Sequence, residues 1–182
     1  MLNQFILDRF AYIPHNTLIE NDYYAVYNTV LAKVFGVIDG PFVIRPPLPQ
    51  ALRVSTINSI TYVVDVNELP IFFLEIKPPL YLDHIDTRID LDAQMRAAFL
   101  ALRDLTPIPR IHGVSAIGQK LAFYCMDKAT GHISPDYVAP STVPVRDTVP
   151  AERWETDITT EEGYGRFLAV INDVKQMAAA LV

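Results

Sequence analysis

The chain has 182 residues, 51% of them hydrophobic, which is enough apolar material for one sizeable core. Its net charge of −6 and pI of about 5.1 argue against extensive sequence-independent binding of nucleic acid, which needs a Lys/Arg surface. No apolar run reaches the roughly 18 residues of a membrane helix, and the single cysteine excludes an internal disulfide. We therefore expect one domain spanning residues 1–182, intracellular (cytoplasmic or nuclear) and without membrane contact.

The first quarter of the chain predicts one helix and one strand. Residues 1–20 have scattered apolar positions, and we interpret them as an irregular lead-in. Asn21 or Asp22 can cap a helix, and apolar residues then recur at helical spacing until Gly36. A first strand is predicted over 41–45, before a proline-rich stretch that cannot continue a ladder.

The stretch 58–77 is the densest β-forming part of the sequence. Two runs rich in Val, Ile, Tyr and Phe flank the polar break 65–68, which predicts two antiparallel strands joined by a tight turn. Residues two apart on a strand share a face, so Glu75 and Lys77 project together from the end of a buried strand. Buried charge is costly unless it is paired, bound to metal or used, so this pair is the first place to look for function.

A second helix is predicted after the strand ends at two prolines. Its apolar residues step by four and three, and the resulting stripe is Leu91, Met95, Ala98, Leu102 and Leu105. Gln94 lies at the edge of this stripe. Four arginines fall within one short region and can form a local basic face: Arg88, Arg96, Arg103 and Arg110.

Two strands, an arm and a last helix complete the expected order. The strands cover 110–116 and 120–126, and a proline-rich arm, 135–158, should lie on the surface with Trp154 as its anchor. The last helix, 159–182, opens with a Thr and a Glu at capping-box spacing, Thr159 and Glu162. Helix, three strands, helix, two strands, arm and helix indicate an α/β (α+β) fold with a mixed sheet flanked by helices.

This order, with Glu75-Ile76-Lys77 ending a meander strand, resembles the core of the PD-(D/E)XK nuclease superfamily. More closely, the chain resembles a group of fungal proteins with that predicted fold, over most of its length from Asn21 onward. The segments that carry the likeness are Phe73-Leu74-Glu75-Ile76-Lys77-Pro78-Pro79, Asp92-Ala93-Gln94-Met95-Arg96, Gly113-Val114-Ser115-Ala116-Ile117-Gly118 and Pro150-Ala151-Glu152-Arg153-Trp154. The resemblance implies a restriction-endonuclease-like mixed sheet.

The resemblance also implies a Mg²⁺ or Mn²⁺ site. In the superfamily an Asp on the second strand and the Glu of Glu-x-Lys hold the metal, and the Lys orients or activates the attacking water. Carried over, Glu75 is a metal ligand and Lys77 acts on water; the alternative is a structural ion pair. Glu20 stands where some relatives have an extra acidic ligand, and Gln94 can reach the site as a glutamine does in some nucleases. From the residues alone, Arg88 and Arg96 are candidates to hold phosphate, and the alternative is that they are solvated arginines on an exposed helix face.

Two residues compete for the Asp position. Asp65 fits by type, but pairing it with Glu75 would centre the turn on Pro70, which gives a poor register. A turn centred just after Val66 instead places Asn58 opposite Glu75, with apolar cross-strand pairs on one face. An Asn there removes one negative charge and should weaken Mg²⁺ binding.

Three hypotheses of function stay open. The first is a Mg²⁺-dependent nuclease whose activity is weakened or lost. The second is a degenerate member that uses the same cleft to bind a protein or a small molecule, which the acidic pI and Asn58 favour. The third is an enzyme of different chemistry that reuses the cleft. Nucleic acid, protein and small-molecule partners all remain compatible with the sequence.

Other chemistry-bearing residues predict no site. The segment 113–117 lacks the final glycine of a nucleophile elbow, and we interpret it as packing. Cys125 alternates with apolar residues in a strand and is expected in the core. The histidines have no metal-ligand spacing: His15, His84, His112 and His132.

Overall fold

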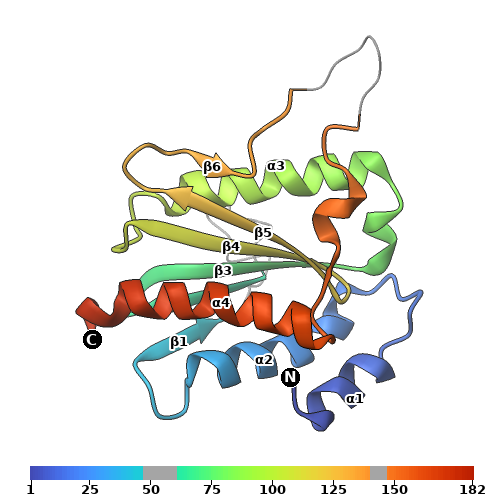
Figure 1. Cartoon of the computed structure of the whole chain (residues 1–182), viewed down its shortest axis with the longest axis horizontal. Coiled ribbons are helices and arrows are strands. Elements are labelled where there is room, and N and C mark those ends of the chain that lie inside the picture. The colour runs from blue at the N-terminus through green and yellow to red at the C-terminus, as the bar shows by residue number, and fades with distance from the viewer. Residues whose placement is uncertain (47–60, 140–146) are drawn as a thin grey trace, which may run out of the picture.

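A central sheet separates two layers of helices in the computed structural model, which describes residues 1–46, 61–139 and 147–182 (Figure 1). One face carries α1 (Gln4–Tyr12), α2 (Tyr24–Phe35) and α4 (Glu161–Ala178), and the other carries α3 (Ile85–Leu102). Short 3₁₀ turns lie at Glu20–Tyr23, Pro79–Leu82, Ala151–Trp154 and Ala179–Leu181. The predicted class, a mixed α/β fold with helices flanking a sheet, is confirmed. No helix of the described ranges has the length and apolarity to cross a membrane.

The sheet is mostly antiparallel and has one parallel pair. Its strands in the described ranges are β1 (Phe42–Arg45), β2 (Tyr62–Val66), β3 (Leu69–Lys77), β4 (Arg110–Ile117), β5 (Lys120–Asp127), β6 (Ile133–Ser134) and β7 (Thr156–Asp157). The spatial order is β1-β2-β3-β4-β5-β6, and β7 pairs with β5. Among these described strands only β3 and β4 run parallel, because α3 carries the chain back to the start of the next strand.

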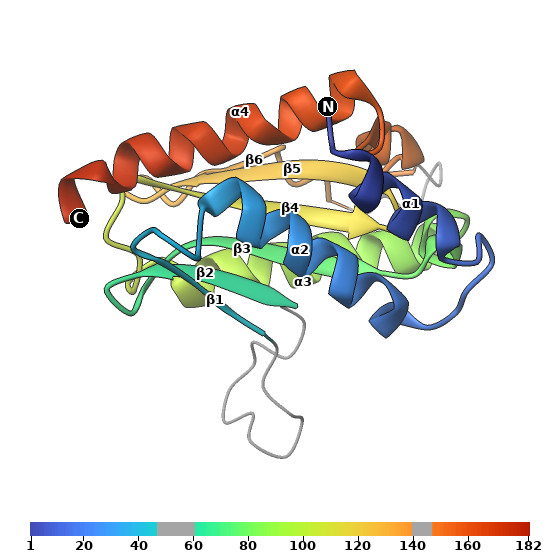
Figure 2. The same ribbon diagram turned by 90° about the horizontal axis from the view of Figure 1, so that it is seen from below.

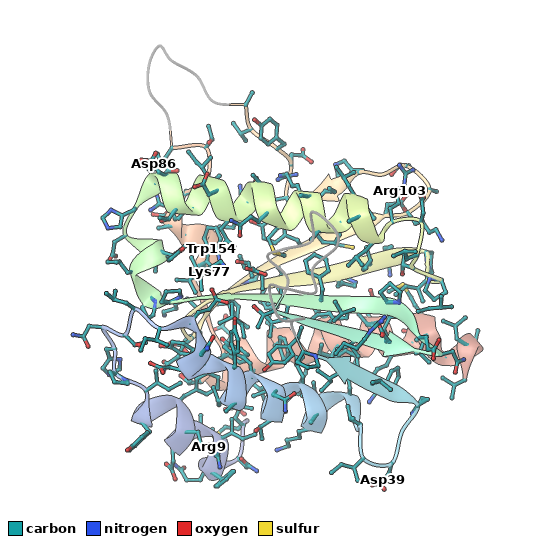
Figure 3. The ribbon with its side chains drawn as sticks, turned by 180° about the vertical axis from the view of Figure 1, so that it is seen from behind. Arg9, Asp39, Lys77, Asp86, Arg103 and Trp154 are labelled. Atoms are coloured by element: carbon teal, nitrogen blue, oxygen red, sulfur yellow. The ribbon has the colours of Figure 1, made fainter. Side chains whose placement is uncertain are left out.

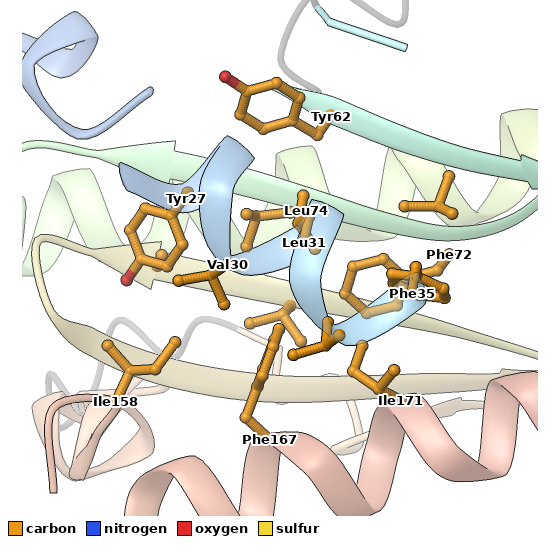
Figure 4. Close-up of a cluster of buried hydrophobic side chains, with 14 of the residues drawn as sticks. Tyr27, Val30, Leu31, Phe35, Tyr62, Phe72, Leu74, Ile158, Phe167 and Ile171 are labelled. Atoms are coloured by element: carbon orange, nitrogen blue, oxygen red, sulfur yellow. The ribbon is translucent and has the colours of Figure 1, made fainter. Parts of the chain in front are cut away.

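The larger core lies between the sheet and α2 and α4 (Figure 4). Alternate residues of β3, Phe72 and Leu74, point into it, and Phe72 contacts Phe35 of α2 and Phe167 of α4. Gly36 ends α2 in the left-handed conformation with φ of 70°, as the sequence predicted. The apolar spacing and the C-terminal glycine therefore predicted the body and the end of this helix correctly.

The smaller core lies under α3. Phe73 of β3 meets Phe99 edge-to-face, with ring centroids 4.8 Å apart. The predicted stripe of α3 is buried from Leu91 to Leu102, whereas Leu105 lies beyond the helix and is 54% exposed. Cys125 is half-buried rather than in the core. The face of β3 that carries Phe73 therefore looks toward α3.

The first 20 residues are not an irregular lead-in. Figure 2 shows helix α1 beside α2. Asn3 caps α1 by accepting a hydrogen bond from the amide of Ile6, and Phe10 packs edge-to-face on Tyr27 of α2. Leu2, Ile6 and Phe10 step by four, so a short helix is stabilised by burying one face. The capping prediction was also wrong, because α2 continues from the 3₁₀ turn Glu20–Tyr23 without a side-chain cap.

The proline-rich arm is more structured than an extended surface segment. Within the described part of 135–158, β7 joins the sheet beside β5. The turn Ala151–Trp154 also packs against β5. Trp154 is 1% exposed, which confirms its predicted role as an anchor. The cap of α4 is Thr160, whose hydroxyl accepts from the amide of Gly163, one residue later than predicted.

Replacing Gly113 with alanine is expected to lower the free energy of unfolding by about 2 kcal/mol. Gly113 pairs with Phe73 across the parallel strands, and an added Cβ would lie 2.4 Å from the Phe73 ring, which is fully buried. Gly165→Ala is the matched control, because nothing lies within 4 Å of its Cβ position on α4. Urea unfolding should show the control unchanged or up to about 1 kcal/mol more stable.

Candidate functional site

The hairpin between β2 and β3 turns at Asn67 and Glu68, later than the sequence predicted. Both residues have positive φ, 50° and 64°, which is the geometry of a two-residue type I′ turn. The register also shifts between Val64 and Asp65. Tyr62 therefore lies opposite Leu74, and not opposite Ile71 as the predicted register required.

This register places a different residue beside Glu75 and moves Asp65 away from it. Thr61 flanks Glu75 instead: its amide donates to Leu74 O, and its hydroxyl accepts from the amide of Ile76. Asp65 lies opposite Pro70 and pairs with Arg45 of β1. Five residues of strand separate Pro70 from Glu75, about 16 Å, so Asp65 cannot share a metal with Glu75. Asn58 lies outside the described residues.

Glu75, Lys77 and Glu20 form one cluster at the end of β3. The ammonium of Lys77 lies 2.7 Å from Glu75 Oε1 and 3.1 Å from Glu20 Oε2. Tyr24 of α2 donates its hydroxyl to the other oxygen of Glu20. The 3₁₀ turn before α2 thus brings an acidic side chain to the end of β3.

The cluster is buried most deeply at Glu75. Glu75 is 1% exposed; its Oε1 pairs with the Lys77 ammonium, and its Oε2 has no hydrogen-bond partner among the described residues. Burial raises the pKa of Glu75 to about 8, with Lys77 acting against the shift and Glu20 adding to it. Burial lowers the pKa of Lys77, but Glu75 and Glu20 outweigh it and the net direction is upward. The pKa values of Glu75 and Lys77 are therefore both raised. This is consistent with a Lys77 that stays charged beside the less buried Glu20 while Glu75 readily takes up a proton.

Tyr24 stays protonated in this cluster. Burial raises its pKa above the ordinary value, and the nearby carboxylates Glu20 and Glu75 raise it further. Its ring also packs edge-to-face on Tyr62, at 6.1 Å between centroids, and Tyr62 donates its hydroxyl to Tyr24 O. Tyr24 is therefore a fixed donor that orients Glu20 toward Lys77.

The α3 side of Glu75 is walled by the arm. Ser115 of β4 is the parallel partner of Glu75, and Trp154 donates its indole N–H to Ser115 Oγ at 3.1 Å. Figure 3 labels Trp154 between α3 and the sheet. The arm therefore closes one side of the site and does not merely pass beside the sheet.

The three other predicted residues all lie on α3. Gln94 has a buried Oε1 without a hydrogen-bond partner among the described residues. Arg88 donates to Val149 O and Leu82 O and pairs with Asp147, and Arg96 pairs with Asp92. Both guanidinium groups thus have partners within the protein, and their role toward phosphate stays a prediction.

Sequence reasoning missed the residues that surround the pair. Four segments of the chain contribute these residues, which are Thr61, Ser115, Tyr24 and Trp154. They matter only because the fold places them around Glu75 and Glu20. One signal was present in the sequence. Asn67 favours the left-handed conformation, so a turn at 67–68 could have been chosen over one centred after Val66.

The site offers few ligands for a metal. Glu75 and Glu20 are its two carboxylates, and no group of three His, Cys, Asp or Glu residues within the described ranges is arranged to hold an ion. Two carboxylates suit a hard divalent cation that keeps several waters, such as Mg²⁺ or Mn²⁺. Oε2 of Glu75 fits that use, since it has no partner among the described residues and a buried acceptor without a donor is costly.

Comparisons with protein-family models, curated proteins and solved structures found no match to this chain.

Proposed function

We propose that this protein is a PD-(D/E)XK-like domain in which Glu75 and Glu20 hold a Mg²⁺ or Mn²⁺ ion for weak phosphodiester hydrolysis. The observation that carries the proposal is the Lys77 ammonium shared by two carboxylates, one of them buried and with no donor to its second oxygen, Oε2, among the described residues. An ion pair kept only for stability gains little from burying a second acid beside the first.

The sheet topology supports the same proposal. Glu75 and Lys77 end β3, and α3 leads from there to the parallel neighbour β4, which agrees with the core order that the resemblance implies. A metal held by Glu75 and Glu20 would supply a bound water of lowered pKa as nucleophile. Lys77 would orient that water, and Tyr24 would hold Glu20 in position.

A second function is favoured by the burial of the site. Glu75 is 1% exposed and Lys77 is partly covered, so a polynucleotide cannot reach the acid in this arrangement. A degenerate domain that binds a small molecule or a protein, without cleavage, fits this enclosure. The acidic net charge of −6 favours it as well.

Manganese binding and nucleic acid cleavage together test the proposal. We expect titration calorimetry with Mn²⁺ to show one site, and Glu75→Gln to weaken it at least about tenfold because a charged ligand is lost. Asp65→Asn removes a second buried carboxylate of the same hairpin and should leave Mn²⁺ binding within about twofold, since it lies about 16 Å away.

Cleavage decides between the two functions. Single- and double-stranded DNA and RNA are incubated with Mg²⁺ or Mn²⁺, and Glu75→Ala and Lys77→Ala are run beside the wild type. Cleavage lost in both variants supports hydrolysis, and cleavage that survives both rejects it. Mn²⁺ binding that depends on Glu75 without any cleavage supports the binding function. A wild-type protein that binds no Mn²⁺ overturns the metal site.

A further inference from the structure

A second charged cluster lies between α3, β5 and the arm, outside the Glu75 site. Its centre is Asp92, which is 3% exposed. Arg96 reaches it from one turn along α3, with Nε 2.7 Å from Oδ2, and Arg153 reaches Oδ1 from the turn Ala151–Trp154. Tyr124 of β5 donates its hydroxyl to Oδ1 at 3.0 Å.

The cluster has more donors than its one acid can use. Asp92 accepts from two guanidinium groups and a hydroxyl, which satisfies both of its oxygens. Nη1 of Arg96, and Nε and Nη2 of Arg153, have no acceptor among the described residues. None of these nitrogens is fully buried. These N–H groups are therefore the donors of the cluster that no described residue occupies.

The cluster carries a net positive charge, which suits an anionic ligand as its unused donors do. Two guanidinium groups surround one carboxylate, which leaves one positive charge, and the Arg96 and Arg153 side chains are only 14% and 13% exposed. The ring of Tyr124 lies 5.8 Å from the Arg153 guanidinium carbon, and that of Tyr137 lies 5.5 Å from the Arg96 one. Partly desolvated, planar and donor-only groups of this kind match the oxygens of a phosphoryl group.

We infer that Arg96 and Arg153 bind a phosphoryl oxyanion, either free phosphate or a phosphate of a nucleic acid strand. The sequence pointed to Arg96 together with Arg88, whereas the structure pairs Arg96 with Arg153, 57 positions along the chain, through Asp92. Arg88 is directed elsewhere, to Asp147 and two backbone carbonyls.

The site stands beside the proposed metal site but does not depend on it. Phe73, Gly113 and Tyr124 form one cross-strand row, and Glu75 and Ser115 belong to the next row on the same face. Two strands and two residues separate Tyr124 from Glu75, which places their Cα atoms about 12 Å apart. One strand of nucleic acid can span such a distance, and phosphate binding can be measured with EDTA present.

Asp92→Asn gives the sharpest test. If the cluster binds phosphate, the change should tighten phosphate binding, whereas a cluster that only clamps the arm to α3 should show no such gain. The neutral amide would compete less than the carboxylate for the guanidinium groups, so we expect inorganic phosphate, measured by titration calorimetry in EDTA, to bind about tenfold more tightly. Arg96→Lys and Arg153→Lys keep the charge but lose the planar fork, and each should weaken binding about tenfold. Arg103→Lys, in which the replaced guanidinium is bonded to Lys128 O and Ala129 O, is the matched control and should leave binding unchanged.

A labelling experiment needs no variant and covers the case of a variant that does not fold. Phenylglyoxal modifies accessible arginines, and mass spectrometry reports the rate at each position. Phosphate should slow modification of Arg96 and Arg153 severalfold and leave Arg103 and the half-exposed Arg110 as references.

A fluorescent oligothymidylate in EDTA separates the two sources of phosphate. Binding of both probes, weakened by the same variants, assigns the site to a nucleic acid strand, whereas binding of inorganic phosphate alone assigns it to a free anion. The inference is overturned if neither probe binds, or if binding and labelling do not depend on Arg96 and Arg153. The cluster would then be only a clamp between the arm and α3. Loss of Mn²⁺ binding in Glu75→Gln with phosphate binding intact would separate this result from that of the metal site.

Discussion

Replacing Lys77 with methionine is expected to lower the free energy of unfolding by about 3 kcal/mol at pH 8 in metal-free solution. The Lys77 side chain is 12% exposed and is the shared cation of Glu75 and Glu20. Methionine keeps a flexible apolar stem and removes the charge, so two acids remain together without a cation. Urea unfolding followed by circular dichroism measures the change.

Lys120→Met is the matched control for this prediction. Lys120 pairs with Asp157 at 3.3 Å but is 43% exposed, so its loss should cost no more than about 1 kcal/mol. In a Glu75→Gln background, Lys77→Met should cost about 1–2 kcal/mol less, because the amide leaves no second charge to compensate. A Lys77→Met protein as stable as the wild type at pH 8 would show that the buried pair does not stabilise the fold.

The wild-type protein should lose stability relative to Glu75→Gln as the pH rises from 5 to 8. The folded Glu75 has a pKa raised to about 8, against 4.5 for the ordinary group. Between these values the unfolded chain releases the proton while the folded chain keeps it, so the contribution present below pH 4.5 is lost as the pH rises through 8. Each pH unit is worth at most about 1.4 kcal/mol, and the raised pKa already includes the opposing effect of Lys77, so we expect up to about 4 kcal/mol from pH 5 to 8.

Urea unfolding at several pH values in EDTA provides this comparison. Glu75→Gln has the shape of the protonated acid and cannot titrate, so the difference between the two proteins isolates this carboxyl group. The difference should change steadily across the window and level off above pH 8. Parallel stability curves would mean that Glu75 is ionised throughout and that Lys77 compensates it fully.

The sequence by itself determined the elements whose patterns are local. The spacing of apolar residues defined α2 and the buried stripe of α3, Gly36 ended α2, and period-two alternation put Glu75 and Lys77 on one face of β3. These features depend on the chemistry of residues a few positions apart, and that chemistry is written directly in the chain.

Short elements that are stabilised by packing could not be predicted from the sequence. Helix α1 has nine residues, too few to be stable alone, and it exists because Ile6 and Phe10 are buried against the rest of the fold. The strand β7 has two residues and is defined by its pairing with β5. Neither has a periodic pattern long enough to recognise.

The make-up of the site was decided by tertiary structure. The Asn67–Glu68 turn and the register shift at Val64 moved Asp65 away from Glu75 and brought Thr61 beside it. Glu20 meets Lys77 across 57 positions of sequence, and Arg153 meets Asp92 across 61. Such contacts arise where strand register and helix packing bring distant segments together, because a single-residue change in register sends every side chain to the opposite face.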